Sequence, residues 1–136
     1  MSILLDTSFI FAFFNKKDEH HESAEKIMQA LRNGLFGKLF ISDYVFDEFV
    51  TLAGAHLRFD LAEEWGQALL DSQKIEFLTT DNDEFKTAWE LFKQFKELSF
   101  TDCTLLSISK HLGIDNIASF DSDFDKTKAI KRIAEV

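Results

Sequence analysis

The segment Ile3-Leu4-Leu5-Asp6-Thr7-Ser8 decides how the rest of the sequence is interpreted. Its three apolar residues predict a short buried strand, and Asp6 follows them directly. A carboxylate is therefore expected just past the end of a strand. Its ordinary role there would be to cap a helix that begins near Ser8, although Thr7 or Ser8 could serve that role instead.

Three further acids occupy positions of a similar kind. A second apolar run, Ile117-Ala118-Ser119-Phe120, ends at Asp121, while Glu48 and Asp102 lie on predicted helices. Carboxylates past strand ends and at a helix start can converge on one crevice, where open α/β sheets usually bind ligands. Four carboxylates held that close would repel one another unless they were protonated or bridged by a cation. The pattern predicts a Mg²⁺ or Mn²⁺ site, used for phosphodiester hydrolysis.

Two of these acids have alternatives that the sequence leaves open. Helical periodicity does not choose between Glu48 and its neighbour Asp47, because both lie near the edges of the apolar stripe. The helix dipole alone would explain an acid at position 102. Ser99 or Thr101 could cap that helix and leave the Asp102 carboxylate free.

A calcium loop is the specific rival for the segment that starts at Asp121. Asp-Ser-Asp-Phe-Asp has acids at positions 1, 3 and 5, as an EF-hand loop does. Such a loop needs Gly at position 6 and Glu at position 12, where this chain has Lys126 and Arg132. The calcium interpretation therefore fails.

The other reactive side chains are expected to be structural. Cys103 has no base near it in the sequence and is expected to be buried. His20 and His21 are adjacent, so on a helix they point in different directions and cannot share a metal. His56 and His111 are isolated and are expected at the surface or its boundary.

Composition favours a single packed domain over residues 1–136. Hydrophobic residues make up 46% of the chain and include 16 Phe, most of them expected in the core, although those near the N-terminus could partly face a partner. A lone cysteine excludes an internal disulfide and suits the cytoplasm. No run reaches the roughly 18 apolar residues that a membrane span requires.

The net charge of −9 argues against generic nucleic-acid binding, which depends on neutralising phosphates. Metal ions bound by the acids would cancel part of it. The densest basic stretch consists of Lys126, Lys128, Lys131 and Arg132. These are either ordinary solvated charges or contacts to an RNA backbone beside the site.

Strands alternate with helices along the chain. Strands are expected at about 2–6, 38–42, 74–78, 115–120 and 128–133, and helices from Ser8 and at about 18–33, 43–57, 59–72, 82–97 and 101–112, with a helical turn near 122–126. This alternation predicts a three-layer α/β/α fold with a central, mostly parallel sheet.

Together these segments resemble the PIN-domain ribonucleases, especially the VapC-type toxins of prokaryotic toxin–antitoxin pairs. The resemblance rests on Leu4-Leu5-Asp6-Thr7-Ser8, on Ile41-Ser42 followed by Val45 and Glu48, on Phe100-Thr101-Asp102 followed by Leu105 and Leu106, and on the segment from Ile117 to Phe124. It favours Glu48 over Asp47. Ser119 stands where Thr is more usual, and Asp123 adds a fifth acid.

The resemblance implies a metal-dependent endoribonuclease that uses metal-activated water. One or two Mg²⁺ or Mn²⁺ ions would be held by Asp6, Asp102 and Asp121, and Glu48 would bind the metal or orient the water. The auxiliary positions are Thr7, Ser8, Ser119 and Asp123. The resemblance also implies a homodimer and an antitoxin whose basic tail covers the acidic groove.

Other functional classes remain as alternatives. A PIN-fold binding or scaffold module would not need the complete set of acids, and a housekeeping RNA-processing PIN nuclease would share it. A haloacid-dehalogenase-type phosphatase would need a second Asp where this chain has Ser8. A response-regulator receiver would need paired acids before its phosphorylated Asp and a Lys downstream, and the sequence does not place that set.

Overall fold

The computed structural model describes all residues, 1–136, arranged about a five-stranded sheet of order β3-β2-β1-β4-β5. Its strands are β1 (Ser2–Leu5), β2 (Lys38–Ser42), β3 (Ile75–Leu78), β4 (Asn116–Ala118) and β5 (Lys131–Ile133). All four neighbouring pairs are parallel, so every strand ends at the same edge of the sheet. The predicted α/β class is confirmed, and the sheet is parallel throughout.

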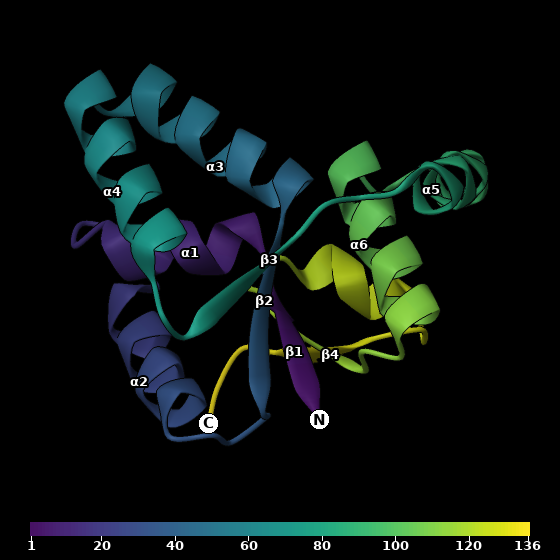
Figure 1. Ribbon diagram of the computed structural model, residues 1–136, viewed down its shortest axis with the longest axis horizontal. Coiled ribbons are helices and arrows are strands. Elements are labelled where there is room, and N and C mark those ends of the chain that lie inside the picture. The colour runs from purple at the N-terminus through teal and green to yellow at the C-terminus, as the bar shows by residue number, and fades with distance from the viewer.

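Helices cover both faces of this sheet. They are α1 (Thr7–Phe14), α2 (His21–Arg32), α3 (Asp43–His56), α4 (Phe59–Asp71), α5 (Asn82–Gln94), α6 (Phe100–Leu112) and the 3₁₀ turn η1 (Ser122–Lys126). In Figure 1, α1, α2 and α4 lie on one side of the strands and α5 and α6 on the other, while α3 continues from the upper end of β2. These are the three expected layers.

Every expected element is present, and the differences lie at element ends. The second helix begins at His21 rather than near residue 18, because the Asp18 carboxylate accepts the His20 backbone N–H (2.8 Å) and holds a turn there. The last strand begins at Lys131 rather than near residue 128, because the Thr127 hydroxyl accepts the Ala129 N–H in a similar turn.

The first strand is the centre of the sheet. Ile3, Leu4 and Leu5 are fully buried, as expected for a parallel strand with helices on both faces. From β1 the chain crosses to β2 on one side and later returns to β4 on the other, so β1 and β4 flank the point where the strand order reverses. Such a switch point leaves a crevice at the strand ends.

An aromatic cluster joins the helices beside this crevice. Phe14 and Phe49 both stack on Trp65, with ring centroids 5.7 and 6.2 Å away, and Phe11 meets Trp65 edge to face. These contacts tie α1, α3 and α4 together, so several of the phenylalanines near the N-terminus pack internally.

None of the helices combines the length and the apolar character needed to cross a bilayer.

Candidate active site

Asp6 lies at the carboxyl end of β1, and its side chain is 3% exposed. It occupies the N-cap position of α1 but makes no side-chain capping bond, so the capping role is not the one that it plays. Its Oδ2 instead accepts hydrogen bonds from the hydroxyls of Ser8 (2.9 Å) and Ser119 (2.6 Å). Burial, with a smaller contribution from the charge of Glu48, raises the pKa of Asp6 to about 6.

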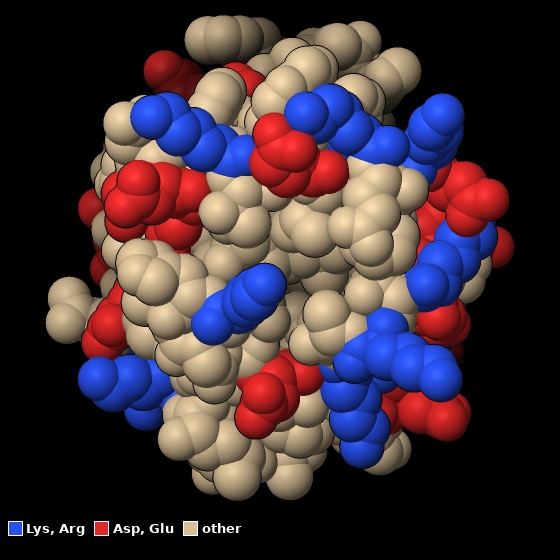
Figure 2. Space-filling view, turned by 90° about the vertical axis from the view of Figure 1, so that its right-hand side faces the viewer, with Lys and Arg blue, Asp and Glu red and all other residues tan.

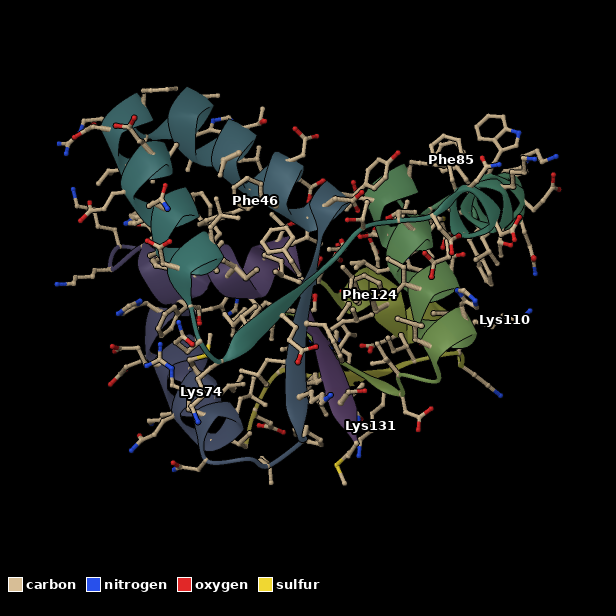
Figure 3. All side chains as sticks on the ribbon, in the orientation of Figure 1. Phe46, Lys74, Phe85, Lys110, Phe124 and Lys131 are labelled. Atoms are coloured by element: carbon tan, nitrogen blue, oxygen red, sulfur yellow. The ribbon has the colours of Figure 1, made fainter.

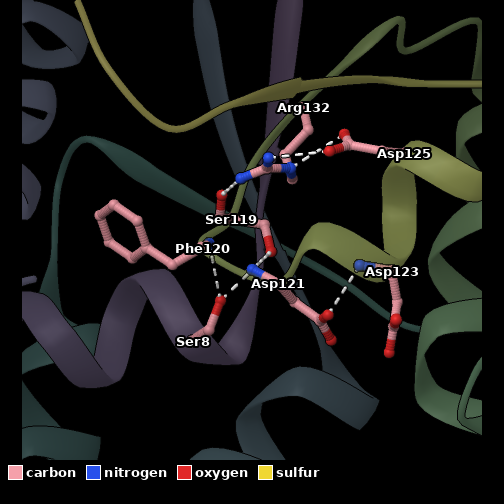
Figure 4. A network of polar contacts seen from close by, with 7 residues as sticks. All are labelled: Ser8, Ser119, Phe120, Asp121, Asp123, Asp125 and Arg132. Carbon is pink, nitrogen blue, oxygen red and sulfur yellow. Dashed lines mark hydrogen bonds and ion pairs between the residues drawn. The ribbon is translucent and has the colours of Figure 1, made fainter.

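The same two hydroxyls connect β1 to the segment that follows β4 (Figure 4). Ser8 Oγ accepts the Phe120 backbone N–H, and Ser119 Oγ accepts that of Asp121, each at 3.0 Å. Asp121 Oδ1 in turn accepts the backbone N–H of Asp123 (2.9 Å). Both serines therefore donate to Asp6. Ser8 accepts from the segment after β4, and Ser119 donates across to Asp6 while it accepts from Asp121 in its own segment, so the two hydroxyls fix Asp6 and Asp121 across the switch point.

Asp102 is held in the first turn of α6 by reciprocal hydrogen bonds with Ser99. Ser99 Oγ accepts the Asp102 N–H (3.0 Å), and Asp102 Oδ2 accepts the Ser99 N–H (3.1 Å). Ser99, one of the two predicted candidates, is therefore the N-cap of α6. These hydrogen bonds use Oδ2 of Asp102 and leave Oδ1 of the same carboxylate free of them. Burial, followed by the charges of Asp6 and Asp121, raises the pKa of Asp102 to about 7. These three carboxylates are close enough to interact.

Glu48 and Asp47 diverge on α3. Glu48 is partly buried and lines the same cavity as Asp6. Asp47 is exposed, and its carboxylate accepts a long hydrogen bond (3.5 Å) from the Thr51 hydroxyl on the surface of the helix. The geometry therefore favours Glu48, which is the choice that the resemblance implied.

An open cavity of about 810 Å³ gathers the four acids at the switch point. Thr7, Ser8 and Asp123 also line it, whereas Ser119 lies buried behind Asp6. The carboxylates on its wall are Asp6, Asp18, Glu48, Glu97, Asp102, Asp121 and Asp123, and no Lys or Arg lies on it. Such a cavity has a strong negative potential and favours a cation.

The oxygen atoms around the cavity suit a hydrated divalent cation. In Asp6, Asp102 and Asp121 one oxygen is held by the hydrogen bonds above, and the second oxygen takes no part in them. The buried Thr7 Oγ1 has no hydrogen-bond partner in the protein. Mg²⁺ keeps several waters and needs only one or two carboxylates directly. Carboxylate oxygens and an orphaned hydroxyl around an open cavity meet that need.

A tighter group of possible metal ligands lies elsewhere. Single atoms of Asp81, Glu84 and His111, where α5 begins and α6 ends, all lie within 4.8 Å of one another, whereas the acids of the cavity form no such group. Asp81 and Glu84 form a capping box, and Glu84 Oε2 lies 2.7 Å from His111 Nδ1. The hydrogen bond to Glu84 raises the pKa of His111, so this group is explained as a charged tie between two helices.

The four predicted RNA-contacting cations have different surroundings. Lys126 Nζ bridges Glu97 (3.3 Å) and Asp123 (2.8 Å) at the edge of the cavity. The Arg132 guanidinium pairs with Asp125 (2.9 Å) and donates to the Ser119 carbonyl, so its charge holds the segment behind the site (Figure 4).

Lys128 and Lys131 are exposed, but Lys131 is poorly placed for the predicted role. It opens β5 and aligns with Asn116 at the start of β4, at the opposite end of the sheet from the acids (Figure 3). On the face that Figure 2 shows, basic residues are interspersed with acidic ones and form no continuous patch. The surface there offers no broad track for a phosphate backbone.

Sequence patterns gave no indication of two histidines on the cavity wall, His20 and His56. His20 stacks on Phe120, a hundred residues away, so no local pattern could reveal its position.

Cys103 matches its prediction, because it is buried and its pKa rises to about 11 through burial and the charge of Asp102.

Comparison with known proteins agrees with this geometry. The family model described as PIN domain matches residues 3–130. A VapC ribonuclease of Archaeoglobus fulgidus is 29% identical over 129 residues, covering 91% of this chain and 80% of that protein. The 23S rRNA-specific endonuclease VapC20 of Mycobacterium tuberculosis is 28% identical over 123 residues, with 90% and 91% coverage.

Solved structures show the same fold. The crystal structure of Mycobacterium tuberculosis VapC20, described as a sarcin-ricin loop cleaving toxin, has a TM-score of 0.81 at 27% identity and covers 91% of this chain and 93% of that one. VapBC2 of Rickettsia felis, solved on a DNA fragment from its promoter, has a TM-score of 0.75 at 13% identity, with 98% of each chain covered. Because the family model spans most of the chain and the curated relatives are nucleases, the chain belongs to the PIN domain family and is a nuclease of the VapC type.

Proposed function

We propose that this protein is an endoribonuclease that requires Mg²⁺ or Mn²⁺ and acts as the toxin of a toxin–antitoxin pair. The observation that carries the proposal is the meeting of Asp6, Asp102 and Asp121 beside Glu48. Burial, with a smaller contribution from the charge of Glu48, raises the pKa of Asp6 to about 6, and burial together with the charges of Asp6 and Asp121 raises that of Asp102 to about 7. Carboxylates in that state are stabilised by a bound cation. The relatives named as ribonucleases support RNA as the substrate.

The acids have distinct roles in this proposal. Asp6, Asp102 and Asp121 would hold one or two ions. When bound, these ions would lower the pKa of a water and stabilise the leaving oxygen. Glu48, which lines the same cavity, would orient the attacking water and take its proton. Ser8 and Ser119 fix one oxygen of Asp6, so that its second oxygen keeps one direction.

Two auxiliary residues complete the proposal. The Thr7 hydroxyl is buried and has no partner in the protein, so we assign it to the support of the site, where a bound water would satisfy it. Asp123 shares its carboxylate with Lys126, so we assign it to shaping the rim rather than to holding metal.

A basic antitoxin segment is the partner that suits the cavity. Its wall carries carboxylates and no Lys or Arg, so a cationic tail would gain from charge complementarity. Similar folds occur in a toxin–antitoxin complex from Klebsiella pneumoniae and in DNA-bound VapBC from Salmonella typhimurium. We also propose a cytoplasmic homodimer. Sedimentation would test the dimer, and a pull-down with the short protein encoded beside this one would test the antitoxin.

The nuclease is tested by incubating the pure protein with total RNA, with Mg²⁺, Mn²⁺ or EDTA, and by mapping the cut ends. Ribosomal RNA is the first pool to inspect, because one relative is specific for 23S rRNA. We expect discrete, metal-dependent cuts that disappear in Asp6→Asn and persist in Asp47→Asn, a matched exchange on the outer side of α3. Absence of cleavage by the folded wild-type protein in every metal and RNA pool would refute the proposal.

A further inference from the structure

The acidic cavity lacks the usual means of holding RNA. Lys and Arg neutralise phosphates in most nucleic-acid interfaces, but neither lies on this wall, and Lys126 at its edge is paired with Glu97 and Asp123. Metal ions at the acids would bind the scissile phosphate but not its neighbours. The flanking nucleotides must therefore be held mainly through their bases, for which aromatic rings are the usual support.

One stacked ring pair lies on the wall beside the acids. The imidazole of His20 and the ring of Phe120 are nearly parallel, with 6° between their planes and 4.5 Å between their centroids. One face of His20 is covered by Phe120, yet the side chain is still 45% exposed. Both residues line the cavity that contains Asp6 and Asp121. An aromatic ring that is partly exposed to solvent thus adjoins the candidate reaction centre.

Hydrogen bonds hold this pair in place. Phe120 directly precedes Asp121, and its backbone N–H is bound by Ser8 Oγ (3.0 Å), as Figure 4 shows. The His20 backbone N–H is bound by Asp18 Oδ1 (2.8 Å), and the next residue, His21, contacts the Ala12 carbonyl through Nδ1 (2.8 Å). A platform fixed in this way can set the position of a base relative to the acids at little entropic cost.

We propose that His20, supported by Phe120, is a stacking platform for one unpaired nucleobase next to the scissile phosphate. The inference rests on the proposed nuclease function and narrows its substrate to RNA whose bases are splayed at the cut, as in loops and single strands. Stacking accepts any base but requires that the base leave its helix. His20 is then a specificity-determining residue that selects RNA conformation rather than sequence.

The test uses an RNA oligonucleotide that spans the mapped cut, together with copies that carry one abasic nucleotide at each position around it. We expect one position at which loss of the base lowers kcat/KM roughly 10-fold or more, as stacking energies imply. His20→Ala should lower kcat/KM on the intact RNA by a similar factor and be insensitive to that abasic site. His20→Phe should retain activity, whereas His20→Leu, which packs without a π face, should not.

The outcomes separate the platform from the nuclease. Cleavage by His20→Leu at the wild-type rate, or an abasic penalty that persists in His20→Ala, would overturn the platform and leave the nuclease standing. Thermal melting of each variant checks that the protein remains folded. If no RNA is cut, the fluorescence of a 2-aminopurine in single-stranded RNA can be measured instead. Quenching of this fluorescence by the wild type but not by His20→Leu would support the stacking platform without the nuclease activity. Equal or absent quenching would overturn it.

Discussion

Replacing Asp6 by Asn should stabilise the metal-free protein at neutral pH while abolishing its activity. The carboxyl is 3% exposed, and its pKa rises from 3.8 to about 6 on folding. The folded state therefore binds a proton more tightly than the unfolded state, so the free energy of unfolding falls as pH rises from about 4 to above 6. A shift of about two units corresponds to roughly 3 kcal/mol, fully expressed at pH 7.5.

Asn should remove most of this penalty without loosening the site. Its Oδ1 can still accept the hydroxyls of Ser8 and Ser119, and its amide can face the carboxylates of Glu48 and Asp102. A gain of up to about 3 kcal/mol would raise the melting temperature of a domain of this size by roughly 10 °C. Asp102 should also ionise more easily, because the charge of Asp6 contributes to raising its pKa.

Urea unfolding in EDTA at pH 5 and pH 7.5 measures the effect for both proteins. His111, whose pKa is also raised, loses its pairing energy as pH rises, so only the difference between wild type and variant isolates Asp6. The variant should gain stability relative to wild type on going from pH 5 to pH 7.5. Added Mg²⁺ at pH 7.5 should stabilise the wild type more than Asp6→Asn, because binding to the folded state alone adds to stability. A variant less stable than wild type in EDTA at pH 7.5 would refute the reasoning.

Three further changes test the supports of the site. Ser119→Ala should cost about 1–3 kcal/mol in urea unfolding and most of the cleavage rate, because Asp6 Oδ2 loses one of its two hydroxyl donors and the Asp121 N–H loses its acceptor, whereas Ser119→Thr should restore both; full activity in the Ala variant would contradict this. Ser99→Ala should lower stability by about 1 kcal/mol through the lost cap and should reduce metal affinity by calorimetry, because the Asp102 backbone N–H loses its acceptor and the first turn of α6, which carries the Asp102 carboxylate, is held less firmly; unchanged affinity would argue that the cap does not position this carboxylate. His111→Ala should lower the melting temperature at pH 5.5 more than at pH 9, because the contact with Glu84 is an ion pair only when the imidazole is protonated, and cleavage should be unaffected. An equal drop in melting temperature at both pH values would show that the charge of His111 does not stabilise the fold.

Much of this architecture follows from short-range patterns. Buried Ile3 to Leu5 give the central strand, and Gly113, with φ of 68° in the left-handed region, ends α6 where the sequence suggested. The convergence of acids after β1 and β4 follows from the topology of parallel sheets. These features depend on neighbouring residues or on rules that apply to the whole sheet.

The remaining features depend on pairs that are distant in sequence. The choice between Glu48 and Asp47 requires the rotation of α3 about its axis, which apolar periodicity left ambiguous. The stack of His20 on Phe120 joins opposite ends of the chain. Arg132 is paired with Asp125, so its positive charge does not by itself indicate a contact with RNA. No local pattern fixes such partners.

The placement of the site across β1 and β4 has a consequence for the timing of its assembly. Asp6 is made more than a hundred residues before Ser119 and Asp121, which complete its surroundings. Until β4 pairs with β1, the central strand is an open edge and the acids have no common cavity. The acids can therefore share one cavity only after the chain has been made through Asp121.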